Sequence, residues 1–315
     1  MTIYALIGAA GYVAPRHLKA MRETGGSLAV AYDTTDSVEI LDDYFPAAAF
    51  FTEFERFDID VNARRRTAAP VDYVAVCSPS YLHKAHATFA LRAGATAICE
   101  QPLVLDPKDI DDLAAIEAET GCKITTILQL RLHPVILALK ERIVAAPADK
   151  TWDVDLSYFT SRGAWYHASW KGIEHKSGGI AASIGAHLYD MLCFIFGPNK
   201  MSIVHHRSAE AAAGYLEFRS ARVRWALSIN RDHLPPDISS SQTTYRSITV
   251  DGEKIEFSDG FAGLHTVSYK SVLNGNGYDL DTVRPSVELF SHIRHATIEP
   301  NKGEQHPHIA KIIRG

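Results

Sequence analysis

The sequence has few cysteines, no long apolar stretch and no large excess of either charge. Its four cysteines form no closely spaced pair, which argues against a disulfide framework and indicates free thiols in a reducing compartment: Cys77, Cys99, Cys122 and Cys193. No stretch approaches the roughly 20 continuous apolar residues that a transmembrane helix needs. The net charge of −5 disfavours a general nucleic-acid or anionic-membrane binder, although a few local cations suffice for a small anionic ligand.

The composition is that of a globular enzyme with two domains. The 315 residues exceed what one core usually supports, and 46% hydrophobic with 22% charged residues are ordinary values. The apolar start up to Gly8 has no basic segment before it and is too short to span a membrane. We therefore expect it to be a buried strand, and we expect a cytoplasmic protein that binds neither membranes nor nucleic acid.

Short apolar runs and amphipathic stretches alternate over the first ~125 residues, as in a parallel α/β sheet. The predicted strands are Ile3–Ile7, Leu28–Tyr32, Ala48–Phe51, Val71–Cys77, Ala95–Cys99 and Lys123–Ile127. The predicted helices are Ala14–Thr24, Tyr81–Ala93 and Lys108–Thr120, the last opened by Asp106-Pro107 and ended by Gly121. This pattern predicts a dinucleotide-binding Rossmann domain over residues 1–126.

The pattern changes after Leu130. Apolar and polar residues alternate in Trp152–Tyr158 and in Arg222–Ile229, which is typical of strands with one buried face. Helices are predicted at Pro134–Val144, Ser183–Phe196 and Ser286–Ala296. We therefore predict that residues 127–315 form an α+β domain with a mostly antiparallel open sheet, which binds substrate and forms the oligomer.

A glycine-rich turn follows the first strand and precedes a helix. Small residues there allow a tight turn and let the backbone approach a pyrophosphate, which would sit on the free N–H groups of the helix. The spacing Gly-x-x-Gly-x-x-Ala is not the strict dinucleotide fingerprint, so an ordinary tight turn remains an alternative. The candidate cofactor residues of this turn are Gly8, Ala10, Gly11, Tyr12 and Val13.

The second strand ends at Asp33, 25 residues after Gly8. A carboxylate there accepts hydrogen bonds from the adenosine ribose and repels a 2′-phosphate, which favours NAD over NADP; a solvated aspartate at a strand end is the alternative. The ends of later strands are expected to reach the same crevice. They supply the further candidates Ser78, Pro79, His83 and Glu100.

At this point the sequence resembles the Gfo/Idh/MocA oxidoreductases, which join a Rossmann domain to an α+β domain with an open sheet. Their Glu-Lys-Pro motif is matched by Glu100-Gln101-Pro102, and their Asn-x-Arg-like junction by Gln129-Leu130-Arg131. Their Gly-Gly-x-x-x-Asp-x-Gly-x-His-x-x-Asp helix entry is matched by residues 178–190. The resemblance covers essentially the whole chain and implies a cofactor contact for Gln129.

The segments around Gly8–His17, Ser161–Tyr166, Ser169–Gly172 and Thr244–Thr249 are similar to one branch of this family, the UDP-N-acetylglucosaminuronate 3-dehydrogenases. That resemblance implies NAD-dependent oxidation of the sugar C3 hydroxyl of UDP-N-acetylglucosaminuronic acid, a step toward sugars of bacterial lipopolysaccharide O-antigen. It also implies a homotetramer.

Oxidation of a secondary alcohol needs a base for the hydroxyl proton, and His187 is the best candidate because histidine titrates near neutral pH. If Ser183 begins the helix, His187 shares a face with Ser183 and Asp190, and Asp190 can orient the imidazole. A half-buried histidine in a helix-packing face is the alternative. The family motif favours a catalytic or substrate-contacting His187.

Gln101 stands where the family has lysine. An amide can hold the reacting hydroxyl by hydrogen bonds but cannot take its proton. Two explanations fit: the chain is a variant with crippled turnover that still binds its ligands, or His187 carries the base role alone. The first explanation keeps open a weakly catalytic protein that binds NAD and a nucleotide sugar.

The diphosphate and the carboxylate of the implied substrate are anionic and are bound by cationic side chains. The candidate cations are Arg131, Arg162, Lys171, Lys176 and Arg246. Each of them alone is more often a solvated charge. Residues 162–171 are aromatic-rich and broken by glycine, which predicts a functional loop, although Trp165 or Tyr166 can instead be interface core. The proposed substrate contacts are Arg131, Arg162, Trp165, Tyr166, Ser169, Lys171 and Ser183.

The remaining histidines show no trustworthy metal-ligand spacing, so we predict no metal: His86, His133, His205, His206 and His265. Other dehydrogenases of the family, acting on a free sugar or inositol, and NADP-linked reductases remain rival functions. Asp33 argues against NADP, and the aromatic–basic segment favours a nucleotide sugar. A plain structural module ignores the Gly8–Asp33 arrangement and ranks last.

Overall fold

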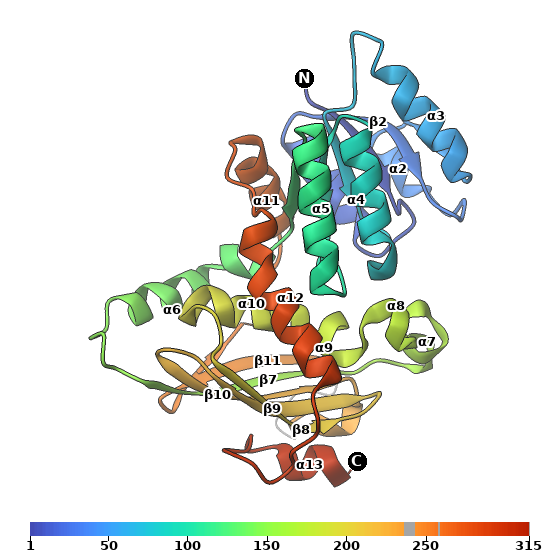
Figure 1. Cartoon of the computed structure of the whole chain (residues 1–315). Helices are drawn as coiled ribbons and strands as arrows, with labels where there is room; N and C mark the ends of the chain where they lie inside the picture. The colour runs from blue at the N-terminus through green and yellow to red at the C-terminus, as the bar shows by residue number, and fades with distance from the viewer. Residues whose placement is uncertain (236–242, 258, 315) are drawn as a thin grey trace. The chain divides into compact units, whose positions relative to one another are not determined.

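The computed structural model describes residues 1–235, 243–257 and 259–314, which divide into two units (Figure 1). The first unit comprises residues 1–132 together with 261–284, and the second comprises residues 133–260 together with 285–314 of the described chain. The sequence predicted a single division after residue 126. The difference lies mainly in segment 261–284, which returns to the first unit and which no local pattern marks.

The first unit is built on a six-stranded parallel sheet in the order β3-β2-β1-β4-β5-β6, as predicted for a Rossmann domain. Its elements are β1 (Ile3–Ile7), α1 (Ala14–Glu23), β2 (Ser27–Tyr32), α2 (Ile40–Tyr44), β3 (Ala49–Phe51), α3 (Phe54–Arg64), β4 (Tyr73–Val76), η1 (Ser80–Leu82), α4 (His83–Arg92), β5 (Thr96–Cys99), α5 (Pro107–Thr120), β6 (Ile124–Thr126), η2 (Gln129–Leu132) and α11 (Leu264–Leu273).

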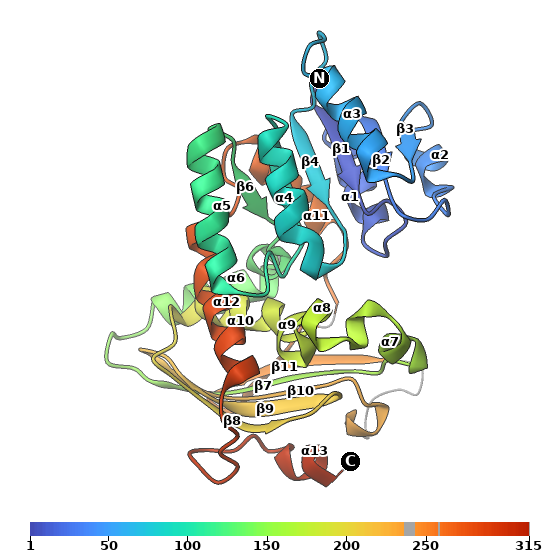
Figure 2. The same cartoon turned by 45° about the vertical axis from the view of Figure 1, so that its right-hand side comes forward.

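Helices cover both faces of this sheet (Figure 2). On one face, apolar side chains of α1 and α11 pack with those of the strands, including Leu18, Met21 and Tyr269 against Tyr4 and Leu6. On the other face lie α4 and α5, and α3 packs against α4 through aromatic rings. A strand that is buried on both faces is apolar at successive positions, so its sequence is a continuous apolar run. For this reason these strands could be predicted from the sequence.

Local signals set the helix ends where they are strong. The Asp106 carboxylate accepts a hydrogen bond from the Lys108 N–H at 3.0 Å, Pro107 occupies the first turn, and Gly121 ends α5 in the left-handed region. These are the residues from which the helix was predicted. The bounds of α5 were therefore predictable from local residues alone.

The second unit holds a six-stranded sheet in the order β12-β11-β7-β10-β9-β8, antiparallel except for the β7–β10 pair. Its elements are α6 (Pro134–Val144), β7 (Trp152–Thr160), α7 (Ala164–Ala168), η3 (Trp170–Gly172), α8 (Glu174–Ser177), α9 (Gly179–Ser183), α10 (Gly185–Phe196), β8 (Met201–Arg207), β9 (Ala211–Glu217), β10 (Ala221–Ser228), η4 (Arg231–His233), β11 (Thr244–Val250), β12 (Glu253–Glu256) and α13 (Ile309–Arg314). Helix α12 (Leu280–His295) begins in the first unit and ends in the second.

Helices α6, α9 and α10 lie over one face of the second sheet, and α13 lies under the other (Figure 1). Ile309 and Ile312 of α13 pack on Phe159, Ala213 and Ala226, so part of the second face is buried as well. The prediction of an α+β domain with a mostly antiparallel sheet is confirmed. Of the described helices, none alone has the length and apolarity to cross a membrane, and one bent pair, residues 174–183 with 185–196, meets those two criteria.

Candidate functional site

The turn after β1 is built around Gly8. Its φ is +90°, and a Cβ there would lie 2.7 Å from the backbone of Cys77 and Ser78, so only glycine fits. The N–H groups of Gly8 and Ala9 both donate to the Tyr32 carbonyl, at 2.8 and 3.2 Å. The strand ends β1, β2 and β4 are thus held together at this turn, as a close approach of ligand to backbone requires.

Helix α1 starts directly after this turn. Its N-terminal residue Val13 makes no side-chain capping bond, and Pro15 occupies the first turn. The side chain of Val13 therefore does not compete with an anion for the N–H groups at the start of this ten-residue helix. Tyr12 is 86% exposed beside it, with the Arg16 guanidinium 5.3 Å from the ring centroid.

Asp33 lies at the end of β2, where it also organises the turn. One carboxylate oxygen accepts the Ala10 N–H at 2.9 Å, and the other accepts the Thr35 N–H at 3.1 Å. The oxygen that accepts the Ala10 N–H, Oδ2, has a second lone pair for a ribose hydroxyl, whereas the Thr34 hydroxyl also lies 3.5 Å from Oδ1. The structure thus brings Gly8, Ala10 and Asp33 together.

The loops after β4 and β5 are joined by His83. Its Nε2 lies 2.7 Å from the Ser78 carbonyl and its Nδ1 lies 2.8 Å from the Pro102 carbonyl. The Ser78 hydroxyl lies 2.7 Å from Nδ1 of His86, whose pKa burial lowers to about 4. Since His83 and Ser78 are buried, their hydrogen bonds hold the two loops in place.

The junction residues predicted from the family motif fall in η2. The buried Oε1 of Gln129 has no hydrogen-bond partner in the described part of the chain, so an acceptor remains for a ligand. Arg131, predicted to bind substrate, donates to the Thr282 carbonyl at 3.2 Å and stacks on Tyr278 at 5.2 Å. Its guanidinium therefore has a structural partner within the first unit.

In the second unit, the aromatic–basic segment forms two short helices, α7 and η3, and not the loop that the sequence predicted. Trp165 is 52% exposed and lies at the surface, whereas Tyr166 is 3% exposed and lies in the interior. The Arg162 guanidinium lies 6.0 Å from the Trp165 ring, and Lys171 Nζ lies 4.5 Å from the Trp170 ring. The Ser169 hydroxyl caps η3 by accepting the Lys171 N–H.

The expectation that Ser183 begins the long helix is wrong. Ser183 ends the short helix α9, and α10 starts at Gly185 after a break at Ile184. The Ser183 hydroxyl lies 2.9 Å from the Tyr166 hydroxyl, so it belongs with the aromatic segment. The i,i+4 argument that joined Ser183 to His187 therefore fails, because the two residues lie in different helices.

His187 and Asp190 lie three residues apart in the first turns of α10. His187 is half-buried and Asp190 is buried, 1% exposed. Of the other predicted cations, Arg246 of β11 donates to the Tyr158 hydroxyl at 3.0 Å, and Lys176 is half-buried in α8. All four residues belong to the second unit.

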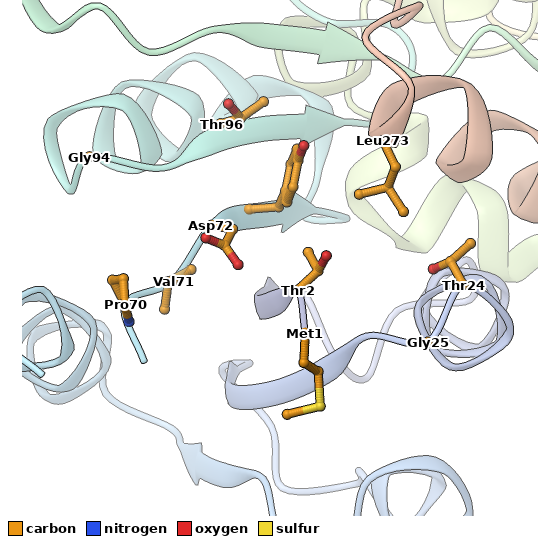
Figure 3. Close-up of a pocket in the computed structure, with 11 residues that line it drawn as sticks. Met1, Thr2, Thr24, Gly25, Pro70, Val71, Asp72, Gly94, Thr96 and Leu273 are labelled. Carbon is orange, nitrogen blue, oxygen red and sulfur yellow. The ribbon is translucent and has the colours of Figure 1, made fainter. Parts of the chain in front are cut away.

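One surface hollow lies at the opposite end of the first sheet from Gly8 (Figure 3). It is lined by residues that precede or begin strands, among them Thr2, Asp72 and Thr96, and by Thr24 and Leu273. Ligands of doubly wound sheets bind at the carboxyl ends of the strands. This hollow is therefore not the predicted cofactor site.

Sequence reasoning missed a buried polar cluster in the first unit. His17, Glu100 and His265 bring their ring nitrogens and a carboxylate oxygen within 4.8 Å of one another, close enough to hold a metal ion. His265 had been set aside for want of a ligand spacing. No sequence signal joins it to His17, because segment 261–284 reaches the first unit only through tertiary packing.

A doubly wound sheet with this turn, followed by an α/β unit, defines a dinucleotide-binding protein of two domains. A family model described as oxidoreductase family, NAD-binding Rossmann fold, matches residues 3–127, and one described as oxidoreductase family, C-terminal alpha/beta domain, matches residues 150–272. The chain belongs to the Gfo/Idh/MocA oxidoreductase family. The predicted family and the predicted cofactor, NAD, are both confirmed.

Two solved structures of the WlbA (WbpB) dehydrogenase from Thermus thermophilus are each 45% identical to this chain. One is in complex with NAD and alpha-ketoglutarate, and the other with NAD and UDP-GlcNAcA. Each match covers 98% of this chain and 100% of the other, with TM-scores of 0.95 and 0.94. A putative UDP-kanosamine synthase oxidoreductase subunit of Amycolatopsis mediterranei is 28% identical over 67% of this chain, which spans only 57% of that relative's length.

Proposed function

We propose that this protein oxidises the C3 hydroxyl of UDP-N-acetylglucosaminuronic acid to the ketone with NAD, in the synthesis of O-antigen sugars. The observation that carries the proposal is the 45% identity, over 98% of the chain, to a dehydrogenase structure in complex with NAD and UDP-GlcNAcA. The Gly8 turn and Asp33 support NAD. The protein acts as a cytoplasmic homotetramer.

The residues of the first unit fit a dinucleotide in two respects: a Cβ at Gly8 would fill the cradle beside β4, and no side chain caps the start of α1. Gly8, Ala10, Gly11, Tyr12 and Val13 hold the pyrophosphate, and Asp33 holds the adenosine ribose. Further contacts come from Ser78, Pro79, His83, Glu100 and Gln129. NAD, when bound, accepts the hydride from the sugar carbon.

In this proposal the proton of the sugar hydroxyl goes to His187, and Asp190 stabilises the imidazolium. Gln101 holds the reacting oxygen by hydrogen bonds and exchanges no proton, since an amide does not titrate. The exposed Trp165, with Arg162, Tyr166, Ser169, Lys171 and Ser183, binds the nucleotide sugar, and Arg131 contributes charge. The balance is one secondary alcohol and NAD⁺ giving one ketone, NADH and a proton.

The test is NADH formation from NAD with UDP-N-acetylglucosaminuronic acid, compared with UDP-N-acetylglucosamine and with inositol. The proposal expects turnover only with the uronic acid, and a product lighter by two hydrogens. Turnover with inositol or with the neutral sugar nucleotide alone would contradict it. Tight binding of NAD and of the nucleotide sugar without NADH formation would favour the second candidate function, a binding protein with little or no turnover. The observation behind that candidate is Gln101, whose amide cannot take the hydroxyl proton.

Replacing Asp33 with alanine should weaken NAD binding by about 10- to 100-fold, because hydrogen bonds to a charged group each contribute about 1.5–3 kcal/mol. Asp33→Asn keeps an acceptor but removes the charge, so it should relax discrimination against NADP with a smaller loss of NAD affinity. The measurement is the Kd of both cofactors by calorimetry.

The control for the two Asp33 variants is Asp36→Ala, which changes an exposed aspartate three residues further along the chain. Its affinities for NAD and NADP should match those of the parent. Unaltered affinities for NAD and NADP in both Asp33 variants would remove Asp33 from the cofactor site.

A further inference from the structure

A charged hydrogen-bond cluster is buried in the first unit, at the end of β5. The Glu100 Oε1 atom lies 2.9 Å from Nε2 of His17 and 2.9 Å from Nε2 of His265. The side chains of His17, Glu100 and His265 are 0%, 11% and 5% exposed. They come from α1, from the residue after β5 and from α11, so one carboxylate joins three separate elements.

Burial and hydrogen bonding shift the pKa values of three groups in this cluster. Burial alone would raise the pKa of Glu100, but the hydrogen bonds from His17 and His265 hold it well below its usual range. Burial lowers the pKa of His17, which is therefore neutral, and raises that of Tyr269 well above its usual value. The Tyr269 hydroxyl, 2.8 Å from Nδ1 of His17, donates to it, and this leaves the proton on Nε2 for Glu100.

The second oxygen of the carboxylate holds the next residue. Glu100 Oε2 accepts the backbone N–H of Gln101 at 3.2 Å. On the far side of the turn, His83 lies 2.8 Å from the Pro102 carbonyl. Residue 101 therefore lies between two residues that are held by hydrogen bonds, Glu100 and Pro102. Through its hydrogen bond to His17, Glu100 also connects residue 101 to α1, the helix that follows the glycine turn.

Two histidines and a glutamate are also a ligand set for zinc. Ligand atoms of a zinc site lie roughly 2 Å from a common ion, whereas here each nitrogen lies at hydrogen-bond distance from the same oxygen. Because Tyr269 and Gln101 complete a consistent pattern of donors and acceptors, the observations favour a hydrogen-bond network. A bound metal is an outcome of the test below.

We propose that Glu100, held by His17, His265 and Tyr269, is a positioning residue that fixes residue 101 and ties it to the cofactor-binding helix α1. The inference rests on the proposed function, which gives residue 101 its place at the reacting oxygen. Glu100 acts through its neighbours and takes no part in proton transfer from the sugar.

The first variant is Glu100→Gln, with Glu53→Gln, an exposed glutamate, as its control. Glutamine replaces one carboxylate oxygen with an NH₂ group, which donates hydrogen bonds and does not accept them. Either an imidazole N–H or the Gln101 N–H therefore loses its acceptor. We expect kcat to fall by about 10- to 100-fold, since small misplacements of a reacting group have effects of that size. The KM for the sugar should change less than about twofold.

The second variant is Tyr269→Phe, which removes one hydroxyl and keeps the ring in the core, so it should fold even if Glu100→Gln does not. Without that donor, His17 is free to adopt the other tautomer, and kcat should fall while NAD affinity is kept. Tyr44→Phe on α2 is the matched control. An unchanged kcat in Tyr269→Phe and Glu100→Gln overturns the proposal.

A readout without substrate separates this inference from the proposed function. Hydrogen exchange at the Gln101 N–H should be protected in the parent and accelerated in Glu100→Gln. If the parent makes no NADH, the proposed function fails, but exchange still decides whether Glu100 anchors residue 101. Unchanged exchange overturns the anchor, and so does stoichiometric zinc in the purified parent that is lost in His265→Gln.

Discussion

His187→Ala is expected to lower kcat by about 10²–10⁴-fold, the usual contribution of a general base, while leaving the Kd for NAD nearly unchanged. The imidazole lies half-buried on α10, in the second unit, and the cofactor turn lies in the first. Its loss removes the proton acceptor without touching a proposed cofactor contact. Steady-state NADH formation and calorimetric NAD titration measure the two effects separately.

The pH profile makes this test specific. A histidine base must be neutral to act, so parental kcat should fall at acidic pH, and that limb should disappear from the residual activity of the variant. His292→Ala, an exposed histidine of α12, is the control and should behave as the parent. If His187→Ala keeps parental turnover, the base lies elsewhere and His187 is a packing residue.

Gln101→Lys is expected to raise kcat by about 10²-fold, at the lower end of a general acid–base contribution. A lysine ammonium can donate to the reacting oxygen as a cation, which the neutral amide cannot do. The ionised Glu100 carboxylate, whose pKa is held low, is the preceding residue and would favour that positive charge. The comparison is NADH formation from UDP-N-acetylglucosaminuronic acid by parent and variant side by side.

Gln305→Lys, an exposed glutamine in the second unit, controls for an added positive charge. If parent and Gln101→Lys turn over equally, His187 carries the proton transfer alone and glutamine belongs to the native mechanism. If neither turns over while both bind NAD, the sugar assignment is wrong or the protein is a binder.

Much of the fold was predictable because its signals are local. Continuous apolar runs gave the six strands of the first sheet, and Asp106, Pro107 and Gly121 gave α5 its ends. Alternation gave β7 and β10. The break at Ile184 was missed although Gly185 follows it directly, because a single glycine inside an otherwise helical pattern does not by itself end a helix.

For the candidate site, the sequence placed those residues that follow strands. Gly8, Asp33, Ser78 and Glu100 were identified because the carboxyl ends of parallel strands meet at one edge of a sheet. The partners of Glu100 were not identified. His17 was read only as part of a similarity, and His265 and Tyr269 belong to a segment assigned to the other domain.

The sequence by itself determined the family, the cofactor and the substitution at residue 101, because motifs and strand–turn–helix punctuation are properties of neighbouring residues. The tertiary structure decided which distant groups are joined by hydrogen bonds. Segment 261–284 packs against α1 because its apolar face completes the core around Tyr269, and this packing puts His265 on the carboxylate of Glu100. Contacts of that kind depend on burial across the fold, and no local pattern encodes them.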